Sequence, residues 1–327
     1  MLFTVVIPVY NRAEIVKRTL DSVAAQTFRP LQVVLADNDS TDGTRAVLDR
    51  WASEHRADDM DIVVTSAPHH TAGAPRNRGF ELATGDWVLF FDSDDVMHKR
   101  LVEDYATVIN DSEFRPDIVS TRATLRQRDG STSSLPFHTP PTAEALLPYQ
   151  ILNSQLATQR YAVRREFFER TDGWNIGVPV WNDWELGIRL LLLQPRVVYL
   201  KKNRVTVHDS GAASVTGTNF YSKHGQWEHV IDIARLNVML DEHLQPEQRV
   251  RLVRLLEFKR MMLAAQYELE GRSDLAKPLC ARSYAALRDT YDNNLCWRWW
   301  VSRVTRWLFA HATRGGRGNA TVARHLY

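Results

Sequence analysis

Three carboxylates fall within four residues directly after an apolar run, in the segment FFDSDDV at residues 90–96. They are Asp92, Asp94 and Asp95, and Ser93 lies between the first two. Clustered carboxylates repel one another unless a positive charge lies between them, most strongly where burial lowers the dielectric constant. Mg²⁺ and Mn²⁺ prefer oxygen ligands, and Mg²⁺ sites commonly combine one or two carboxylates with substrate phosphates. The segment therefore suggests a cation site, although a solvated acidic turn that caps the next helix would have the same composition.

Polar side chains follow three earlier apolar runs in the same way. The runs are FTVVIPV at residues 3–9, LQVVLAD at 31–37 and DIVVTS at 61–66, and their β-branched residues predict buried strands. The polar residues at or beyond their ends are Tyr10, Asn11 and Arg12, then Asp37, Asn38 and Asp39, then His69, His70, Arg76 and Asn77.

Helical segments separate these strands, which predicts how the polar residues are brought together. Residues 13–27, 40–55 and 73–85 have helical spacing, and we expect Ser40 and Thr41 to cap the second helix and Gly85 to end the third. Alternating strands and helices predict an α/β fold with a mostly parallel sheet flanked by helices. In such sheets the ligand crevice lies beyond the carboxyl ends of the strands. The polar residues should therefore converge on one edge.

The rest of the chain is less regular up to about residue 219 and helical beyond it. A hairpin is expected to turn at Asp129-Gly130, and a helix should begin near Asp183. Residues 197–200 and 204–207 read as two short strands. Further helices are predicted at residues 220–240, 246–271 and 273–291.

Bulk composition sets limits on the kind of protein. Of 327 residues, 44% are hydrophobic and 24% charged, as in a globular protein, and the net charge of +2 gives no reason to expect nucleic acid as a partner. The two cysteines are too few for a disulfide framework, which favours the cytoplasm. No run reaches the roughly 18 apolar residues of a spanning helix. We expect a cytoplasmic protein, or one peripheral at the inner face of the plasma membrane.

Several motifs in order resemble one known family. VVIPVYNR, DNDSTDGT, GAPRNRGFELATGDWVLFFDSDD and WNDWELGIRL together resemble glycosyltransferase family 2, whose members have the GT-A (Rossmann-like) fold. The resemblance covers about residues 3–215. It implies a catalytic domain at residues 1–218, a helical C-terminal region at 219–327, and inverting transfer of a sugar from a nucleotide-diphospho-sugar. The implied donor is UDP-linked, and the implied acceptor is a saccharide or a lipid-linked saccharide, as in cell-surface polysaccharide synthesis.

The resemblance also implies roles for individual residues. Asp94 and His208 match the ligands of a divalent metal, Mn²⁺ or Mg²⁺, and Asp95 could share or replace the role of Asp94. One departure affects the nucleotide of the donor: the family often has an acid that can accept from the uracil ring at the position where this chain has Asn38. The implied nucleotide-sugar contacts are Pro8, Tyr10, Asn11, Asp37, Asn38, Arg76, Asn77, Asp92 and Ser93.

In the segment WNDWE, Asp183 matches the family's catalytic base. Transfer with inversion needs one base to take the proton of the acceptor hydroxyl. Asp183 could instead be a first-turn acid that the helix dipole favours, and Glu185 is the alternative base. The family often has Glu where Asn182 stands, so a neighbouring charge is missing. Trp174 is expected either to stack on the acceptor sugar or to be packed in the interior.

Two other classes of function remain open. A sugar nucleotidyltransferase on a related sheet would make the activated sugar, but it usually needs a glycine-rich phosphate loop, and PVYNRAE lacks glycine. A non-catalytic nucleotide-sugar binder would tolerate the loss of Asp94 and Asp183. Metal-dependent release of UDP from sugar donors distinguishes an enzyme from a binder.

The segment at residues 297–308 suggests a separate partner. Its apolar face would carry Trp297, Trp300, Val301, Val304, Trp307 and Leu308, and its opposite face would carry Arg298, Arg303 and Arg306. No acidic residue follows Asp292. This pattern is typical of a helix lying in an anionic membrane interface, or of one that docks on the protein's own helices or on a second subunit of a homo-oligomer.

Overall fold

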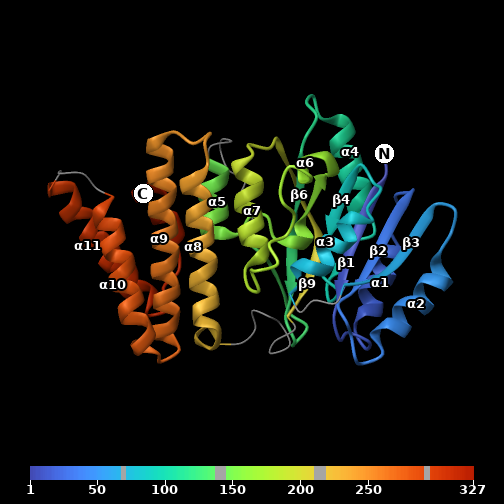
Figure 1. Cartoon of the computed structure of the whole chain (residues 1–327), viewed down its shortest axis with the longest axis horizontal. Helices are drawn as coiled ribbons and strands as arrows, with labels where there is room; N and C mark the ends of the chain where they lie inside the picture. The colour runs from blue at the N-terminus through green and yellow to red at the C-terminus, as the bar shows by residue number, and fades with distance from the viewer. Residues whose placement is uncertain (68–70, 137–144, 210–218, 291–294) are drawn as a thin grey trace. The chain divides into compact units, whose positions relative to one another are not determined.

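The computed structural model describes residues 1–67, 71–136, 145–209, 219–290 and 295–327, and it contains an α/β part followed by a helical part (Figure 1). Four parallel strands form the first half of the sheet, in the spatial order β3-β2-β1-β4. Strands β1, β2 and β4 are almost fully buried, as expected for strands covered on both faces, whereas the edge strand β3 is only partly buried. Their bounds are Phe3–Val9 (β1), Leu31–Asp37 (β2), Met60–Ser66 (β3) and Trp87–Phe90 (β4).

The second half of the sheet is mixed. Beyond β4 the order continues β8-β6-β9-β5, with β8 antiparallel to both β4 and β6 and with β9 parallel to β6. The longest pairings, β1 with β2, β2 with β3 and β6 with β9, are parallel. The sheet is thus mostly parallel, and the predicted fold class is confirmed. The strand bounds are Val96–Met97 (β5), Ile118–Arg126 (β6), Thr132–Ser134 (β7), Tyr161–Arg164 (β8) and Val197–His208 (β9).

Helices cover both faces of the parallel strands. Odd-numbered residues of β1, from Phe3 to Val9, pack in one core with the apolar sides of α1, α2 and α4. On the other face, Phe80 of α3 and Phe168 of α6 form an aromatic cluster with Phe90 of β4. The alternation follows from the two-residue period of a strand. The helix bounds are Val16–Ala24 (α1), Thr44–His55 (α2), Gly73–Glu81 (α3), Leu101–Asp111 (α4) and Arg165–Phe168 (α6).

Two expected helix ends are wrong. The residue that caps α2 is Gly43, at φ +87°, so neither Ser40 nor Thr41 is the cap. Helix α3 ends at Glu81, and the residue that caps it is Leu82 and not Gly85. Gly85 has another role, because a Cβ atom there would lie 2.7 Å from the backbone nitrogen of Thr4.

The expected hairpin is confirmed. The two short strands expected at residues 197–200 and 204–207 form a single strand, β9. Strands β6 and β7 are antiparallel, and Gly130 of their connection has φ +83°. Strand β9 runs without a break along β6, with register shifts next to Arg122. The polar residues Lys201, Lys202 and Asn203 suggested a turn between two strands. They lie instead within β9, where a bulge accommodates them without ending the strand.

The chain divides into two compact units. One contains Met1–Thr139, Leu156–Leu186 and Leu193–Gly211, and the other contains Pro140–Gln155, Gly187–Leu192 and Ala212–Tyr327. The predicted division between residues 218 and 219 stays a prediction. The remaining helices, which include those predicted after residue 219, are Leu146–Asn153 (α5), Asn182–Leu192 (α7), His224–Leu240 (α8), Pro246–Leu269 (α9), Ser273–Asp289 (α10), Leu295–Ala312 (α11) and Asn319–Leu326 (α12).

None of the helices in the described part of the chain combines the length and apolarity that crossing a bilayer requires.

Candidate active site

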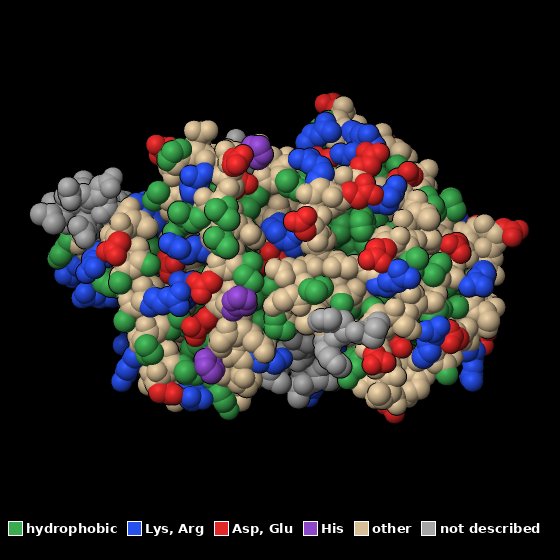
Figure 2. Space-filling model, in the orientation of Figure 1, with side chains coloured by type: hydrophobic (Ala, Val, Ile, Leu, Met, Phe, Trp, Pro, Cys, Tyr) green, Lys and Arg blue, Asp and Glu red, His purple; other side chains and the backbone are tan. Residues whose placement is uncertain are grey.

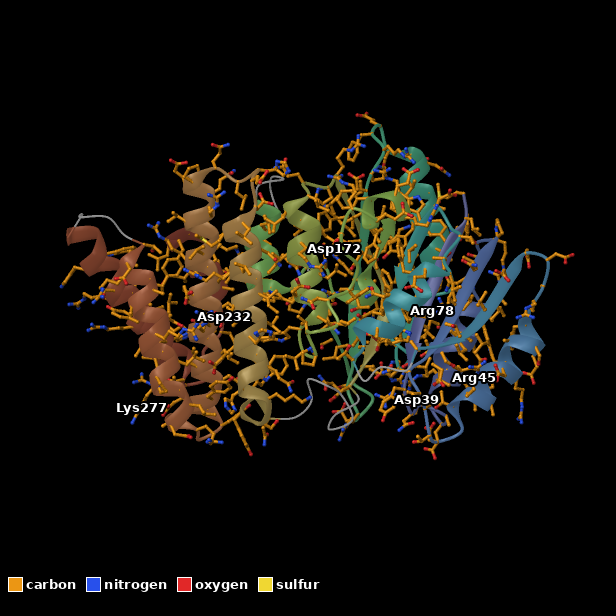
Figure 3. The ribbon with its side chains drawn as sticks, in the orientation of Figure 1. Asp39, Arg45, Arg78, Asp172, Asp232 and Lys277 are labelled. Carbon is orange, nitrogen blue, oxygen red and sulfur yellow. The ribbon has the colours of Figure 1, made fainter. Side chains whose placement is uncertain are left out.

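The carboxyl ends of β1, β2 and β4 meet at one edge of the sheet, where Asp39 is labelled in Figure 3. The register pairs Val9 of β1 with Asp37 of β2, so the loops that follow these strands leave the sheet side by side. The backbone nitrogen of Asn38 donates to the carbonyl of Val9 at 2.8 Å and extends this pairing by one bond. The predicted convergence of polar strand ends is therefore present at this edge.

The loops after β1 and β2 form a polar cradle. Asp37 and Asn38 are each only 5% exposed, and an Oδ1 oxygen of each has no hydrogen-bond partner among the described residues. Buried acceptors normally have a donor, so these oxygens are suited to the N–H or O–H groups of a ligand. Asn11, at φ +49°, accepts from the backbone nitrogen of Thr41 at 2.9 Å and ties the two loops together.

Two other predicted contact residues flank this cradle. Tyr10 is 48% exposed at the end of β1, where its ring can stack on a planar group. Pro8, two residues before Tyr10 in β1, is partly buried. His69 and His70 lie outside the described residues.

A buried arginine lies against the acidic turn. Arg76 of α3 is 5% exposed, and its Nη2 donates to Oδ1 of Asp92 at 2.6 Å. Its guanidinium lies 4.4 Å from the centre of the Trp174 ring, in a cation–π contact. Nε and Nη1 of Arg76 have no hydrogen-bond partner among the described residues. Arg76 therefore holds spare buried donors of the kind that bind a phosphate oxygen.

The side chain of Asn77 holds Trp174 in place. Its Nδ2 donates to the Trp174 carbonyl at 2.8 Å, and its Oδ1 accepts from the Trp174 backbone nitrogen at 2.7 Å. Gly173, at φ +71°, permits this approach, because a Cβ atom there would lie 2.7 Å from Oδ1 of Asn77. Trp174 is 1% exposed, so it is packed in the interior and does not present a face to a sugar. Direct contact of Asn77 with a nucleotide stays a prediction.

The acidic turn is fastened to α1. Nη2 of Arg18 donates to the carbonyl of Asp94 at 2.6 Å, and Oγ1 of Thr19 donates to the carbonyl of Asp95 at 2.7 Å. Ser93 is 8% exposed within the turn. Burial raises the pKa of Asp92, the charge of Asp94 raises it further, and Arg76 opposes the rise. The acids of the turn therefore disfavour one another's ionised forms, and Arg76 opposes this effect at Asp92.

Asp95 connects this turn to the end of β9. It is 2% exposed, and its Oδ1 accepts from the backbone nitrogen of His208 at 3.0 Å. Burial, and then the charges of Asp92 and Asp94, raises the pKa of Asp95 well above its usual value. This carboxylate therefore positions the residue that was predicted to complete a metal shell.

Two substitutions of Asp95 distinguish a role in positioning His208 from a role as a metal ligand. We expect Asp95→Asn to keep Mn²⁺ affinity within a few fold, because the amide oxygen can still accept from His208. Asp95→Ala leaves a buried N–H without its acceptor, which costs about 1–3 kcal/mol and should weaken Mn²⁺ binding accordingly. Electron paramagnetic resonance titration of Mn²⁺ measures both. Equal loss in the two variants would mean that the Asp95 charge itself ligates the metal.

The side chains that could ligate a metal here fit a hard divalent cation that takes some of its ligands from a substrate. Among the described residues, no group of three or more His, Cys, Asp or Glu side chains is arranged to hold a metal alone. Asp94 is partly buried beside two other acids, and Asp92 already binds Arg76. Burial lowers the pKa of His208, which favours the neutral imidazole, the form that ligates metals. Asp94 and His208 are the residues that would hold the cation.

The first turn of α7 supplies an acid to the same site. Burial, and then the charge of Asp92, raises the pKa of Asp183, while Arg76 opposes the rise. Oδ1 of Asp183 accepts from the backbone nitrogen of Trp184 at 2.8 Å, and the side chain remains partly exposed. Glu185 is only 1% exposed. Of the two acids, only Asp183 is accessible to a substrate.

Arg160 is a site residue that no motif identified. It is 4% exposed, and its Nη2 donates to the carbonyl of Pro136 at 3.1 Å. Burial lowers its pKa to about 10, and the nearby charge of Asp183 opposes the fall. Arg160 ends a short 3₁₀ segment, Thr158–Arg160, which precedes β8. Arg18 and Thr19 were missed as well, because their role depends on backbone carbonyls that a sequence does not show.

The family model for glycosyl transferase family 2 matches residues 4–170, just over half of the chain, and the chain therefore belongs to this family. The amylovoran biosynthesis glycosyltransferase AmsB of Erwinia amylovora is 33% identical over 132 residues, which are 39% of this chain and 43% of that protein. The poly(ribitol-phosphate) beta-N-acetylglucosaminyltransferase TarS of Staphylococcus aureus is 31% identical over 115 residues, 34% of this chain and 19% of TarS. These matches span less than half of either relative.

Solved structures share the fold over nearly the whole chain. TarS residues 1–349 in complex with UDP-GlcNAc matches with a TM-score of 0.67 at 18% identity, covering 99% of this chain and 91% of that one. A mannosyltransferase from Pyrobaculum calidifontis, in complex with GDP-Man and Mn²⁺, matches with a TM-score of 0.56 at 18% identity and covers 99% and 86%. At these identities the likeness extends to the fold alone.

Proposed function

We propose that this chain is an inverting, metal-dependent glycosyltransferase of the GT-A type. It would move a sugar from a nucleotide-diphospho-sugar, UDP-linked in our proposal, to a hydroxyl of a saccharide or of a lipid-linked saccharide. One observation carries the proposal: Asp183, Arg76 and the acidic turn lie within electrostatic reach of one another at the strand ends. In this proposal Asp183 would be the proton acceptor and Arg76 the phosphate-binding group of one site.

The donor would lie across the ends of β1, β2 and β4. The buried oxygens of Asp37 and Asn38 are suited to accept from the base and ribose, and Tyr10 is exposed beside them. The spare donors of Arg76 are suited to the diphosphate. Asn38 can accept a hydrogen bond but carries no charge, and the solved relatives bind either UDP-GlcNAc or GDP-Man. We favour UDP because TarS, which has the higher TM-score, binds it.

The chemistry needs one base and one stabilised leaving group. Asp183 would take the proton of the acceptor hydroxyl while the oxygen attacks the anomeric carbon, and the bond to the diphosphate would break on the opposite face. A Mn²⁺ or Mg²⁺ ion held by Asp94 and His208 would supply positive charge for the departing diphosphate. Asp92 would keep Arg76 in place through their ion pair. This arrangement differs from that of glycosidases, which use two carboxylates.

The relatives favour a role in making a cell-surface polysaccharide. Their names concern amylovoran and poly(ribitol-phosphate), and we extend only the class of acceptor to this chain. The sugar nucleotidyltransferase has no support, because family 2 is a family of glycosyl transferases. A non-catalytic binder has the same family membership and needs the test below. A cytoplasmic location and a homo-oligomer stay predictions.

Release of UDP from a panel of UDP-sugars tests the proposal. We expect Mn²⁺-dependent release from at least one donor, stimulated by acceptor and abolished by EDTA. A thermal-shift panel of UDP, GDP, CDP and dTDP with Mn²⁺ identifies the base, since a ligand at about 100 times its dissociation constant stabilises by about 2.7 kcal/mol. Stabilisation by a nucleotide without release from any matching sugar would favour the binder, and no stabilisation would contradict the nucleotide site.

A further inference from the structure

The outer face of α11 exposes three tryptophans and two arginines. Trp299 is 61% exposed, Trp300 46% and Trp307 57%, and Arg303 and Arg306 are exposed as well. These residues share one side of the helix, because positions three, four, seven and eight apart recur on the same face. Exposed large aromatic side chains gathered in this way usually mark an interaction surface.

The structure corrects the predicted division of this helix. Val301 and Leu308, assigned to one apolar face with Trp300 and Trp307, are 3% and 0% exposed and lie on the opposite side of the helix. Thr305, which is 1% exposed, lies on the buried side with them. The inner face is therefore the packed one, and on the outer face two arginines lie between Trp299 and Trp300 on one side and Trp307 on the other. The side chains of Trp297 and Arg298 lie outside the described residues.

The inner face fastens α11 within the helical unit. Oγ1 of Thr305 and the hydroxyl of Tyr327 are 2.5 Å apart, and the Tyr327 ring lies 5.6 Å from that of Phe258 in α9. Nδ1 of His311 lies 2.8 Å from Oδ1 of Asn319 in α12. The outer face is thus presented by a helix that is already packed, and exposing it needs no rearrangement.

The charged side chains of α11 and of the residues after it are all basic, whereas α10 also carries Asp274 and Asp289. Six arginines and no Asp or Glu follow Asp292. Figure 2 shows Lys and Arg side chains gathered over α10 and α11 at the left end of that view. A second copy of the same face would bring arginines against arginines, which is unfavourable. The face is complementary to an anionic partner.

Arginines that lie between exposed tryptophans favour a lipid surface as the partner. The indole ring prefers the level of the headgroups, where an apolar ring and a polar N–H are both accommodated. The guanidinium of Arg303 lies 4.7 Å from the centre of the Trp299 ring, and such stacking lowers the cost of bringing the charge toward a less polar region. From Trp299 to Trp307 the helix extends only about 12 Å, which suits a helix lying in the interface.

We propose that the outer face of α11 docks on anionic membrane surfaces. Trp299, Trp300 and Trp307 would insert at the headgroup level, and Arg303 and Arg306 would pair with lipid phosphates. Docking of this kind would bring the chain to acceptors anchored in the same membrane.

Flotation with vesicles tests the proposal. We expect binding to phosphatidylcholine vesicles that contain 30% phosphatidylglycerol, loss of binding at 0.5 M NaCl, and little binding to phosphatidylcholine alone. Each arginine near an anionic surface contributes roughly fivefold in affinity, so Arg303→Gln with Arg306→Gln should weaken binding about 25-fold. The variant with Trp299→Ser, Trp300→Ser and Trp307→Ser should lose binding, and a blue shift of tryptophan fluorescence on binding should be absent from it.

Matched substitutions and competing partners make the test decisive. Arg45→Gln with Arg50→Gln on α2 makes the same charge change elsewhere and should bind as the wild type does; equal weakening would mean that only net charge matters. Melting temperatures check that each variant is folded.

Two competing partners would overturn the proposal. A dimer in ultracentrifugation that the tryptophan variant abolishes would favour a second copy of the chain. Tighter binding to a single-stranded oligonucleotide than to the vesicles would favour a nucleic acid. No substrate is present, so the result is independent of sugar transfer.

Discussion

Asp183→Asn is expected to lower the rate of transfer by 10²- to 10⁴-fold while donor binding is retained. The amide has the same shape and can still accept from the backbone nitrogen of Trp184, so the first turn of α7 should keep its conformation. It cannot take a proton from the acceptor, and this is the range that loss of a general base produces. Steady-state transfer measures the rate, and calorimetric titration with UDP and Mn²⁺ measures donor-site binding.

The matched comparison is Glu185→Gln, two positions further along the same helical turn. Glu185 is 1% exposed, so it should not reach an acceptor, and we expect any loss of transfer in a folded Glu185→Gln variant to be small beside that of Asp183→Asn. Transfer near the wild-type rate by Asp183→Asn would reject Asp183 as the base.

The wild-type pH profile gives a further check on the same residue. The pKa of Asp183 is raised, first by burial and then by the charge of Asp92. Only the ionised form accepts a proton, so transfer should be retained above this raised pKa and should fall as the pH decreases through it. The acid limb should therefore lie above the pKa of an ordinary Asp.

Asp94→Asn is expected to reduce transfer by roughly a hundredfold or more. A metal ion that neutralises a leaving diphosphate contributes several kcal/mol, and each 1.4 kcal/mol is a factor of ten. The substitution removes the charge of the proposed ligand without changing its size, so Mn²⁺ titrations should show a higher activation constant. Direct Mn²⁺ binding in the presence of UDP should weaken in parallel.

Asp58→Asn is the control for that substitution, since Asp58 is an exposed acid before β3 that loses the same charge away from the acidic turn. It should leave the Mn²⁺ titration unchanged. If Asp94→Asn showed wild-type Mn²⁺ dependence, the metal role of Asp94 would have to be abandoned.

The sequence predicted the parallel half of the sheet well, because each strand there is a short β-branched run between helical segments. The predicted bounds of β1 and β2 match those observed, since both strands are buried on both faces and polar residues begin at Tyr10 and at Asp37. Helix ends were less predictable, because tertiary contacts override local capping. Oγ1 of Thr44 accepts from the backbone nitrogen of Arg12, so the start of α2 is held by the loop after β1 and not by Ser40 or Thr41.

The site was predicted as a set of residues but not as a set of contacts. Convergence of Asp37, Asp92 and Asp183 follows from strand ends and motif order. What Asn77 does could not be read from the sequence, because its partner Trp174 is 97 residues away along the chain. The two faces of α11 were misassigned for a related reason: composition does not show which side of an amphipathic helix packs against its neighbours.

A crystal structure with UDP and Mn²⁺ tests most directly whether the acidic turn holds a cation against the donor's diphosphate. We predict an anomalous manganese peak within about 2.5 Å of an Asp94 oxygen and of a diphosphate oxygen, with the base beside Asp37 and Asn38. A manganese peak elsewhere, or a bound nucleotide away from the ends of β1, β2 and β4, would contradict the account.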